Sequence, residues 1–194
     1  MMHAEVDGER LPPMAMASFF ILLSTAGNAT TRHATSHGLC LLTEHPDQRE
    51  LWLADPEGVT PTAVEEIVRW ATPVISFRRT ATRDTELGGV PIAEGDKVML
   101  WYESANRDER QFDNPYSFDV GRDPNYHLAF GHGEHFCLGA NLARWELRAT
   151  FKELAPHLVN LEAAGPLVRH PDLHVPAIHT FKVKKSKLKL RIVV

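Results

Sequence analysis

The chain has 194 residues, of which 43% are hydrophobic and 24% charged, a composition typical of an ordinary globular protein and not of a disordered one. Its formal net charge of -4 gives no electrostatic basis for binding nucleic acid, so we exclude that class of partner. The only two cysteines, Cys40 and Cys137, do not indicate a disulfide framework, and we expect a reducing, cytoplasmic location.

The first predicted element is one long helix from Pro13 to about Leu42, which no later proline interrupts. Its first half is apolar almost all round, which predicts a helix that passes through the middle of a core. The apolar run at residues 14–23 is too short to cross a bilayer, and acidic residues precede it. We therefore expect neither a membrane span nor a secretory signal.

The centre of this helix carries Gly27 close to the hydroxyl groups of Thr30 and Thr31. Glycine costs about 1 kcal/mol in a helix interior, and threonine hydroxyls can compete for backbone carbonyls. Helices bend or open at such places, so the sequence predicts an irregularity here.

Two further helices are expected before the first strand. The first is short, at residues 48–53, and a loop over residues 55–58 separates it from the second, which runs from Pro61 to Trp70. Glu66 and Arg69 are three residues apart on the second helix, so they share one face and can form an ion pair.

A β pattern follows Pro73. Residues 74–81 and 97–101 are predicted to be strands, with a hairpin turn at residues 87–90 and a second turn at residues 94–96. Residues 104–108 are expected to form a short helix, and an irregular loop follows. Near the end of the chain, residues 182–194 alternate between basic and apolar, which indicates a half-exposed strand.

The stretch from Phe130 to Gly139 reads Phe-Gly-His-Gly-Glu-His-Phe-Cys-Leu-Gly. Its glycines allow a tight loop, and from residue 142 the apolar positions recur with helical spacing to about residue 157. Cys137 therefore lies near a helix N-terminus, where loop amides directed at its sulfur and the helix dipole would lower the pKa of the thiol. Such a thiolate is a good axial ligand for haem iron. The alternatives are a buried structural thiol, or a zinc site with His132 and His135.

The pattern Phe-Gly-x-Gly-x-His-x-Cys-x-Gly resembles the haem-ligand loop of the cytochrome P-450 family, the haem-thiolate monooxygenases. The resemblance implies a mainly α fold with small β-sheets, in which residues 1–194 are the C-terminal half of a single P-450 domain. It implies haem b as the cofactor and Cys137 as the iron ligand, with Phe130 shielding the sulfur and His135 binding a propionate. The other loop and helix positions that it places beside the cofactor are Gly131, Gly139 and Ala26.

The same resemblance assigns roles to the middle of the long helix. Gly27 would make room for dioxygen, and Thr30 would organise the supply of protons. The family usually has Asp or Glu directly before that threonine, whereas this chain has Ala29. Because a methyl group cannot relay a proton, we expect poor coupling, with reducing equivalents lost as peroxide.

Further positions match the family's pattern outside these two segments. Glu66 and Arg69 match its Glu-x-x-Arg motif, and Arg122 would complete the structural triad that braces the cysteine side. Arg79 would pair with the other haem propionate. The expected substrate-facing residues are Val74, Ile75, Ser76 and, in a turn at residues 175–178, Ile178.

The function that the resemblance implies is hydroxylation of an apolar substrate with O2 and electrons from a redox partner. Residues 65–80 and 104–108 are similar to actinobacterial members that oxidise steroids or branched lipids, which take electrons from a ferredoxin-type donor. Arg144 and Arg148 are candidate contacts for that donor. Since the other half of the fold is missing from the chain, we expect an exposed apolar surface and marginal stability. The alternative function is a non-catalytic haem-binding remnant.

Overall fold

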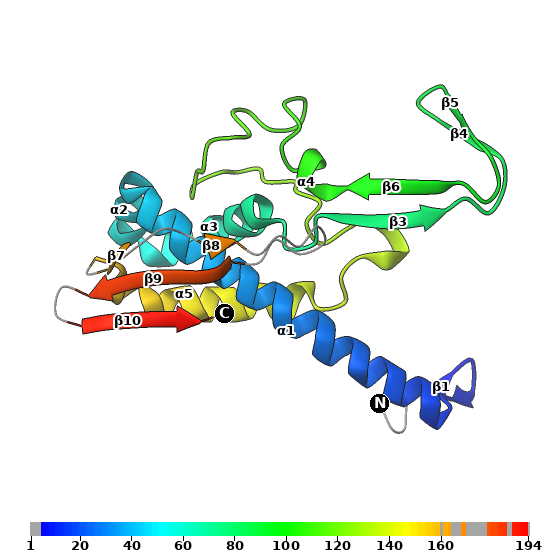
Figure 1. The fold of residues 1–194 in the computed structure, drawn as a ribbon, viewed down its shortest axis with the longest axis horizontal. Helices are drawn as coiled ribbons and strands as arrows, with labels where there is room; N and C mark the ends of the chain where they lie inside the picture. Colours follow the sequence, from blue (N-terminus) through cyan, green and yellow to red (C-terminus); the bar gives the residue numbers. More distant parts are fainter. Residues whose placement is uncertain (1–4, 160, 164–167, 170–177, 186–187, 194) are drawn as a thin grey trace.

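The computed structural model describes residues 5–159, 161–163, 168–169, 178–185 and 188–193. The chain is mainly helical with small antiparallel sheets, as predicted (Figure 1). The helices are α1 (Pro13–Glu44), α2 (Pro46–Ala54), α3 (Pro56–Ala71), α4 (Tyr102–Ala105) and α5 (Ala140–Leu158), with a 3-10 helix at Gly133–His135. The strands are β1 (Glu5–Val6), β2 (Glu9–Arg10), β3 (Ser76–Thr80), β4 (Thr85–Leu87), β5 (Val90–Ile92), β6 (Lys97–Trp101), β7 (Leu161–Ala163), β8 (Val168–Arg169), β9 (Ile178–Lys185) and β10 (Leu188–Val193).

The core lies where the C-terminal half of α1 meets α3 and α5, with α2 covering one end. Its fully buried side chains include Leu42, Trp52, Ile67, Leu147 and Phe151. The buried indole of Trp52 also donates a hydrogen bond to Thr60 Oγ1, at 2.9 Å. On α3 and α5 the buried apolar residues recur with helical spacing, whereas α2 contributes Trp52 alone.

Gly38 lets α1 approach the other two core helices closely. A Cβ atom at this position would lie 2.4 Å from Phe151 Cζ and 2.8 Å from Ile67 Cδ1. Both neighbours are fully buried, so neither ring nor methyl group has free space into which it could move. The glycine is therefore needed for packing at this point.

The long helix is confirmed and ends two residues later than expected, but its first half does not lie in a core. Met14, Phe20 and Ile21 are 77%, 68% and 65% exposed. In Figure 1 this end of α1 projects away from the other helices. The prediction of a helix through the middle of a core is therefore wrong for this half, because an apolar pattern within one segment does not say which other segment covers it.

α1 does not open in its centre, where we expected the helix to bend or open. The helix continues through residues 26–32. Thr30 Oγ1 donates to the carbonyl oxygen of Ala26 at 2.8 Å, and Thr35 Oγ1 donates to that of Thr31 at 2.9 Å. Each hydroxyl shares a carbonyl four residues earlier instead of displacing a backbone bond, so the helix is retained.

α3 begins at Pro56, so the loop expected at residues 55–58 is wrong except for its first residue. Asp55 is the N-cap, and its Oδ1 accepts a hydrogen bond from the Gly58 amide at 3.0 Å. Pro56 then occupies the first helical position, where its missing N–H costs nothing. Pro61, which we expected to open the helix, lies inside it on the exposed side.

The two β-hairpins lie close to where the sequence predicted them. β3 pairs antiparallel with β6, with Ser76 opposite Trp101 and Thr80 opposite Lys97. β4 and β5 form the second hairpin, in which Gly88 and Gly89 have φ values of 59° and 80°. Positive φ at both central residues is what a tight two-residue hairpin turn requires. α4 begins two residues earlier than the helix expected at residues 104–108, and ends at residue 105.

The single strand expected at residues 182–194 is in fact two strands. β9 and β10 pair antiparallel, with Lys182 opposite Arg191, and β7 and β8 also pair with β9. Ile178 is the first residue of β9, and residues 175–177 of the predicted turn lie outside the described residues. None of the helices in the described part of the chain is both long enough and apolar enough to cross a membrane.

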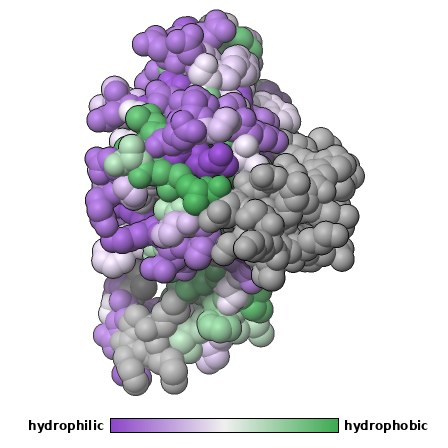
Figure 2. All heavy atoms as spheres, turned by 90° about the vertical axis from the view of Figure 1, so that its left-hand side faces the viewer, coloured by the Kyte–Doolittle hydropathy of each residue, from purple (hydrophilic) through white to green (hydrophobic). Residues whose placement is uncertain are grey.

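The surface at the α2 end of the molecule is mainly hydrophilic, with a smaller hydrophobic area among polar residues (Figure 2). This contrasts with the exposed apolar residues of the first half of α1. The two halves of α1 therefore have different environments: the apolar first half is exposed, whereas residues of the second half such as Leu39 and Leu42 are buried in the core.

We predict that Gly38→Ala lowers the free energy of unfolding by about 1–3 kcal/mol, because the added methyl group must displace Phe151 or Ile67. Gly27→Ala on the same helix is the matched control, since a Cβ there would meet no atom within 4 Å. It should be neutral or stabilise by up to about 1 kcal/mol. Urea unfolding followed by circular dichroism measures both, and equal effects would contradict the packing role of Gly38.

Candidate functional site

The cysteine loop, residues 130–139, is closed by its own backbone. Gly131 and Gly133 both have φ of 73°, a conformation that other residues rarely adopt. The Phe136 amide donates to the Gly133 carbonyl at 3.0 Å, and the Cys137 amide donates to the Phe130 carbonyl at 2.9 Å. The two glycines thus fold the loop back on itself, and the last of these bonds fixes Cys137 beside Phe130.

The Cys137 thiol is exposed, three residues before the start of α5. The alternative of a buried structural thiol is therefore wrong. Among the described residues no N–H donates a hydrogen bond to Cys137 Sγ, and the Phe136 and Cys137 amides bond to backbone carbonyls. That loop amides are directed at the sulfur stays a prediction. The loop leaves the sulfur accessible at the surface of the molecule.

The described residues also exclude the zinc alternative. No group of three or more His, Cys, Asp or Glu side chains among them lies close enough together to hold a metal ion. His132 and His135 are both exposed, His132 as the N-cap and His135 as the last residue of the 3-10 helix. Cys137 is left as a single soft ligand, which suits a metal whose other ligands come from a cofactor.

Large apolar side chains flank this thiol. Phe136, Leu138 and Leu142 are 50%, 75% and 64% exposed, and all three lie within five residues of Cys137. A flat apolar macrocycle with a central iron would cover such a surface and take the thiolate as its axial ligand. The residues present therefore fit a haem.

The two residues expected at the haem propionates lie on separate elements and do not contact each other. His135 is exposed in the 3-10 helix. Arg79 is half-buried on β3, where its guanidinium donates to the Arg78 carbonyl at 3.2 Å and lies 5.5 Å from the centroid of the Phe77 ring. Of the expected substrate-facing residues, Val74 and Ile75 are half-buried, whereas Ser76 is buried.

The residues expected on the distal side lie on the projecting part of α1 and just after it. Ala26 and Gly27 are exposed, and Thr30 is half-buried. The Thr30 hydroxyl donates to the Ala26 carbonyl, so in this conformation its proton is held within the helix. Ala29 is half-buried beside it and offers only a methyl group.

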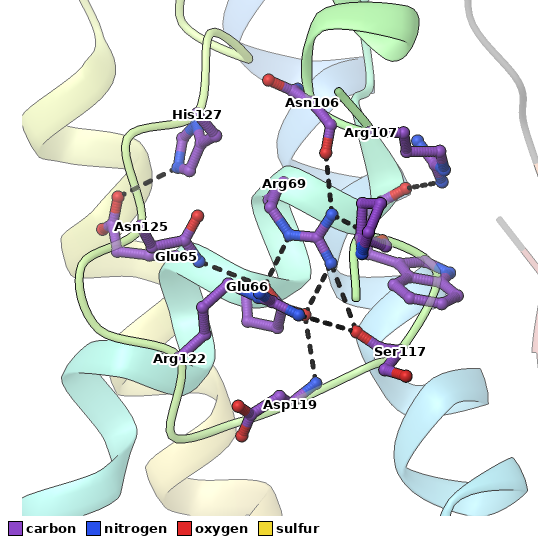
Figure 3. A network of polar contacts seen from close by, with 12 residues as sticks. Glu65, Glu66, Arg69, Asn106, Arg107, Ser117, Asp119, Arg122, Asn125 and His127 are labelled. Atoms are coloured by element: carbon purple, nitrogen blue, oxygen red, sulfur yellow. Dashed lines mark hydrogen bonds and ion pairs between the residues drawn. The ribbon is translucent and has the colours of Figure 1, made fainter. Parts of the chain in front are cut away.

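The structure brings together the three residues of the predicted triad (Figure 3). Glu66 and Arg69 are both fully buried, and the Arg69 Nε and Nη2 atoms each donate to one Glu66 oxygen at 2.7 Å. Arg122 Nε donates to Glu66 Oε2 at 3.1 Å from the loop after α4. Because an isolated buried charge is very costly, each of these ions depends on the others.

The triad also binds the backbone of the long irregular segment at residues 106–132. Arg69 Nη1 donates to the carbonyls of Asn106 and Pro115, at 2.7 and 2.9 Å. Arg122 donates to the carbonyls of Asp113 and Ser117. This segment forms neither a helix nor a strand, so its carbonyl groups have no regular backbone donors. The two guanidinium groups supply hydrogen bonds to several of these carbonyls instead.

Two asparagines belong to the same network, and the sequence did not reveal them. Asn106 is fully buried; its Nδ2 donates to Thr72 Oγ1 at 2.9 Å and its Oδ1 accepts from the Leu128 amide at 2.6 Å. Asn125 Nδ2 donates to Glu66 Oε2 at 3.1 Å. Both asparagines lie in stretches of turn-forming residues, where an asparagine is expected to be solvated, so no local signal distinguishes them.

Glu65, the neighbour of Glu66, forms a second network on another side of α3. Its carboxylate accepts from Arg144 Nε and Nη2 at 2.7 and 2.8 Å, and His127 Nε2 lies 3.1 Å from its Oε2. Burial works against ionisation of Glu65, but the hydrogen bonds from His127 and Arg144 and the charge of Arg144 outweigh it and lower the pKa of Glu65 to about 2. Arg144, which we expected to contact a redox partner, therefore forms an ion pair with Glu65 in this structure.

Comparison with known proteins places this geometry in context. The family model described as Cytochrome P450 matches residues 59–155. The chain is 53% identical over 187 residues to a methyl-branched lipid omega-hydroxylase of Mycobacterium tuberculosis, covering 96% of this chain and 44% of that protein. It is 49% identical over 166 residues to a steroid C26-monooxygenase of Rhodococcus jostii, covering 85% of this chain and 35% of that protein.

A solved structure is similar over the same extent. The cytochrome P450 of Mycobacterium marinum in complex with pseudoionone has a TM-score of 0.88 and 50% sequence identity, and the match covers 94% of this chain and 44% of that one. The chain thus spans less than half the length of these proteins.

We predict that Glu66→Gln lowers the free energy of unfolding by about 3–5 kcal/mol, because it leaves the buried Arg69 charge without a counter-ion. Asp108→Asn is the control, since Asp108 pairs with Arg110 only at the exposed surface, and it should leave the urea midpoint unchanged. A small effect of Glu66→Gln in the same urea experiment would contradict the dependence of the fold on this carboxylate.

The lowered pKa of Glu65 predicts a pH dependence of stability. The folded state binds this proton less tightly than the unfolded state, whose value is near 4.5. The stabilisation from Glu65 is therefore fully present above that pH and is lost as the pH falls toward 2. Unfolding free energies of the wild type and of Glu65→Gln should differ at pH 5.5 and converge near pH 2. A difference that stays constant over this range would contradict the assignment.

Proposed function

Because the chain belongs to the cytochrome P450 family, we propose that it is part of a single haem-thiolate monooxygenase domain that hydroxylates an apolar substrate. The observation that carries this proposal is an exposed Cys137 thiol on a glycine-bracketed loop, surrounded by exposed apolar side chains. Haem b, when bound there, would supply the chemistry that activates dioxygen for insertion of one oxygen atom into a C–H bond.

The residues of the chain would divide the remaining tasks between them. Cys137 would hold the iron, with the Phe130 ring beside the sulfur and the loop bond from the Cys137 amide keeping its direction. Arg79 and His135 are the cations available for the propionates, from β3 and from the loop. Of the two, Arg79 is already partly ordered by its contact with the Phe77 ring.

On α1, Gly27 would leave space for dioxygen, because it has no side chain that could occupy that space. Thr30 would hold and pass a proton once its hydroxyl turns away from the Ala26 carbonyl. The buried triad of Glu66, Arg69 and Arg122 would act indirectly, by fixing the segment that leads into the cysteine loop.

The relatives support a substrate class. One is named a methyl-branched lipid omega-hydroxylase and the other a steroid C26-monooxygenase. We propose a steroid or branched lipid as the substrate, with Val74, Ile75, Ser76 and Ile178 on its side of the pocket. We also propose a ferredoxin-type protein as the electron donor and the cytoplasm as the location.

A second function is favoured by Ala29. Its methyl group cannot relay a proton to Thr30, so the chain could bind haem as a non-catalytic remnant of such an enzyme. Product formation per electron consumed separates the two functions: a monooxygenase forms hydroxylated product, whereas a remnant gives a haem spectrum without turnover.

The experiment that tests haem-thiolate ligation is the absorption spectrum of the reduced, CO-bound protein after addition of haem. A thiolate-ligated haem shifts the main band to the red, and we predict that Cys137→Ser abolishes this shift. Cys40→Ala, which removes the buried second cysteine, should keep it. Persistence of the shifted band in Cys137→Ser would identify a different axial ligand, and its absence from the wild type would argue against the proposed function.

A further inference from the structure

Glu65 makes two contacts that both lead to the segment where the cysteine loop begins. One goes to His127 and the other to Arg144, so a single carboxylate on α3 connects the irregular segment before the loop with the helix after it. The His127 side chain is 2% exposed, and those of Glu65 and Arg144 are 20% and 25% exposed. The group is therefore largely shielded from water, where charge-assisted hydrogen bonds are strongest.

The first contact fixes the tautomer of His127. The Ala129 amide donates to His127 Nδ1 at 3.2 Å, so Nδ1 acts as an acceptor and carries no proton. The ring proton must then be on Nε2, where it is donated to Glu65 Oε2. Without that acceptor the other tautomer becomes available, and its Nδ1 proton would oppose the Ala129 amide. Glu65 thereby holds the backbone one residue before Phe130.

The second contact holds Phe130 itself. The guanidinium of Arg144 lies 4.5 Å from the centroid of the Phe130 ring, and Glu65 holds its orientation through two parallel hydrogen bonds. A stacked guanidinium attracts the face of an aromatic ring, more strongly when water is excluded. The carbonyl of the same Phe130 accepts the hydrogen bond from the Cys137 amide. Both contacts of Glu65 therefore converge on Phe130, the residue that anchors the cysteine.

We propose that Glu65, with His127 and Arg144, is a positioning group that sets the conformation of the cysteine loop. Its effect on haem ligation rests on the proposed function, but its effect on the loop does not, because every contact in the argument lies within this chain. The group is separate from the triad around Glu66, although the two carboxylates are adjacent in sequence.

The chain offers a matched control for this proposal. Glu57 and Lys152 form another ion pair between α3 and α5, with side chains 79% and 61% exposed. Glu57→Gln therefore removes a carboxylate from the same helix, facing a cation on the same partner helix, without touching the loop. Any difference between Glu65→Gln and Glu57→Gln reports on the loop and not on the packing of α3 against α5.

The test is hydrogen exchange of the full 194-residue chain, followed by NMR at the Cys137 amide. A glutamine at residue 65 carries no charge and has one acceptor oxygen, so it cannot accept the Arg144 Nε bond made to Oε1 in addition to the His127 and Arg144 Nη2 bonds made to Oε2. We expect exchange at Cys137 to become about tenfold faster or more in Glu65→Gln, and unchanged in Glu57→Gln. The amide of Ile67, in the core of α3, should stay protected in both variants, which shows that the fold is intact.

Arg144→Lys provides a second variant that retains the charge but loses the paired hydrogen bonds and the flat group that stacks on Phe130. It should also speed exchange at Cys137, by less than Glu65→Gln, because the His127 contact remains. Equal exchange at Cys137 in the wild type, Glu65→Gln and Arg144→Lys would overturn the proposal.

The spectrum of the reduced, CO-bound protein distinguishes failure of this proposal from failure of the proposed function. If both hold, Glu65→Gln lowers the fraction of protein with the red-shifted band, and Glu57→Gln does not. If the wild type shows no such band while the exchange difference remains, the positioning role stands without the haem function. A normal band in Glu65→Gln together with unchanged exchange rejects the positioning role alone.

Discussion

The buried carboxylate of Glu66 is the constraint on which the rest of this structure depends. It compensates Arg69 and Arg122, and these two cations in turn hold the carbonyls of a long segment without regular secondary structure. A segment of that kind usually lies at the surface because it cannot satisfy its own backbone. Here Arg69 of α3 and Arg122 of the segment itself donate the hydrogen bonds that a helix or sheet would otherwise supply. The segment that leads into the loop with Cys137 is therefore held in one conformation.

The sequence predicted the features that depend on local chemistry. The helical spacing of apolar residues predicted α1 and α5, the Gly88-Gly89 pair predicted a hairpin, and the spacing of Glu66 and Arg69 predicted a pair on one helix face. The start of α3 was mispredicted because Pro61 and Pro56 are both plausible first residues of a helix. The side-chain cap from Asp55 decides in favour of Pro56.

What the sequence did not reveal depends on contacts between distant residues. Glu65 and His127 are ordinary polar residues in their own surroundings, and only the packing of α5 on α3 places them with Arg144. The exposed first half of α1 is the opposite case. Its apolar pattern was recognised, but whether such a surface is covered is not encoded in the segment itself, and in this chain of less than half its relatives' length the surface is open.

The adjacency of Glu65 and Glu66 has a mechanical consequence. Successive side chains on an α-helix point about 100° apart, so one turn of α3 serves the triad on one side and the Phe130 contacts on another. A small rotation of this helix about its axis would tilt both carboxylates together. The triad around Glu66 and the loop that carries Cys137 are therefore both held by α3. A rotation of α3 that changed the position of one would also change the position of the other.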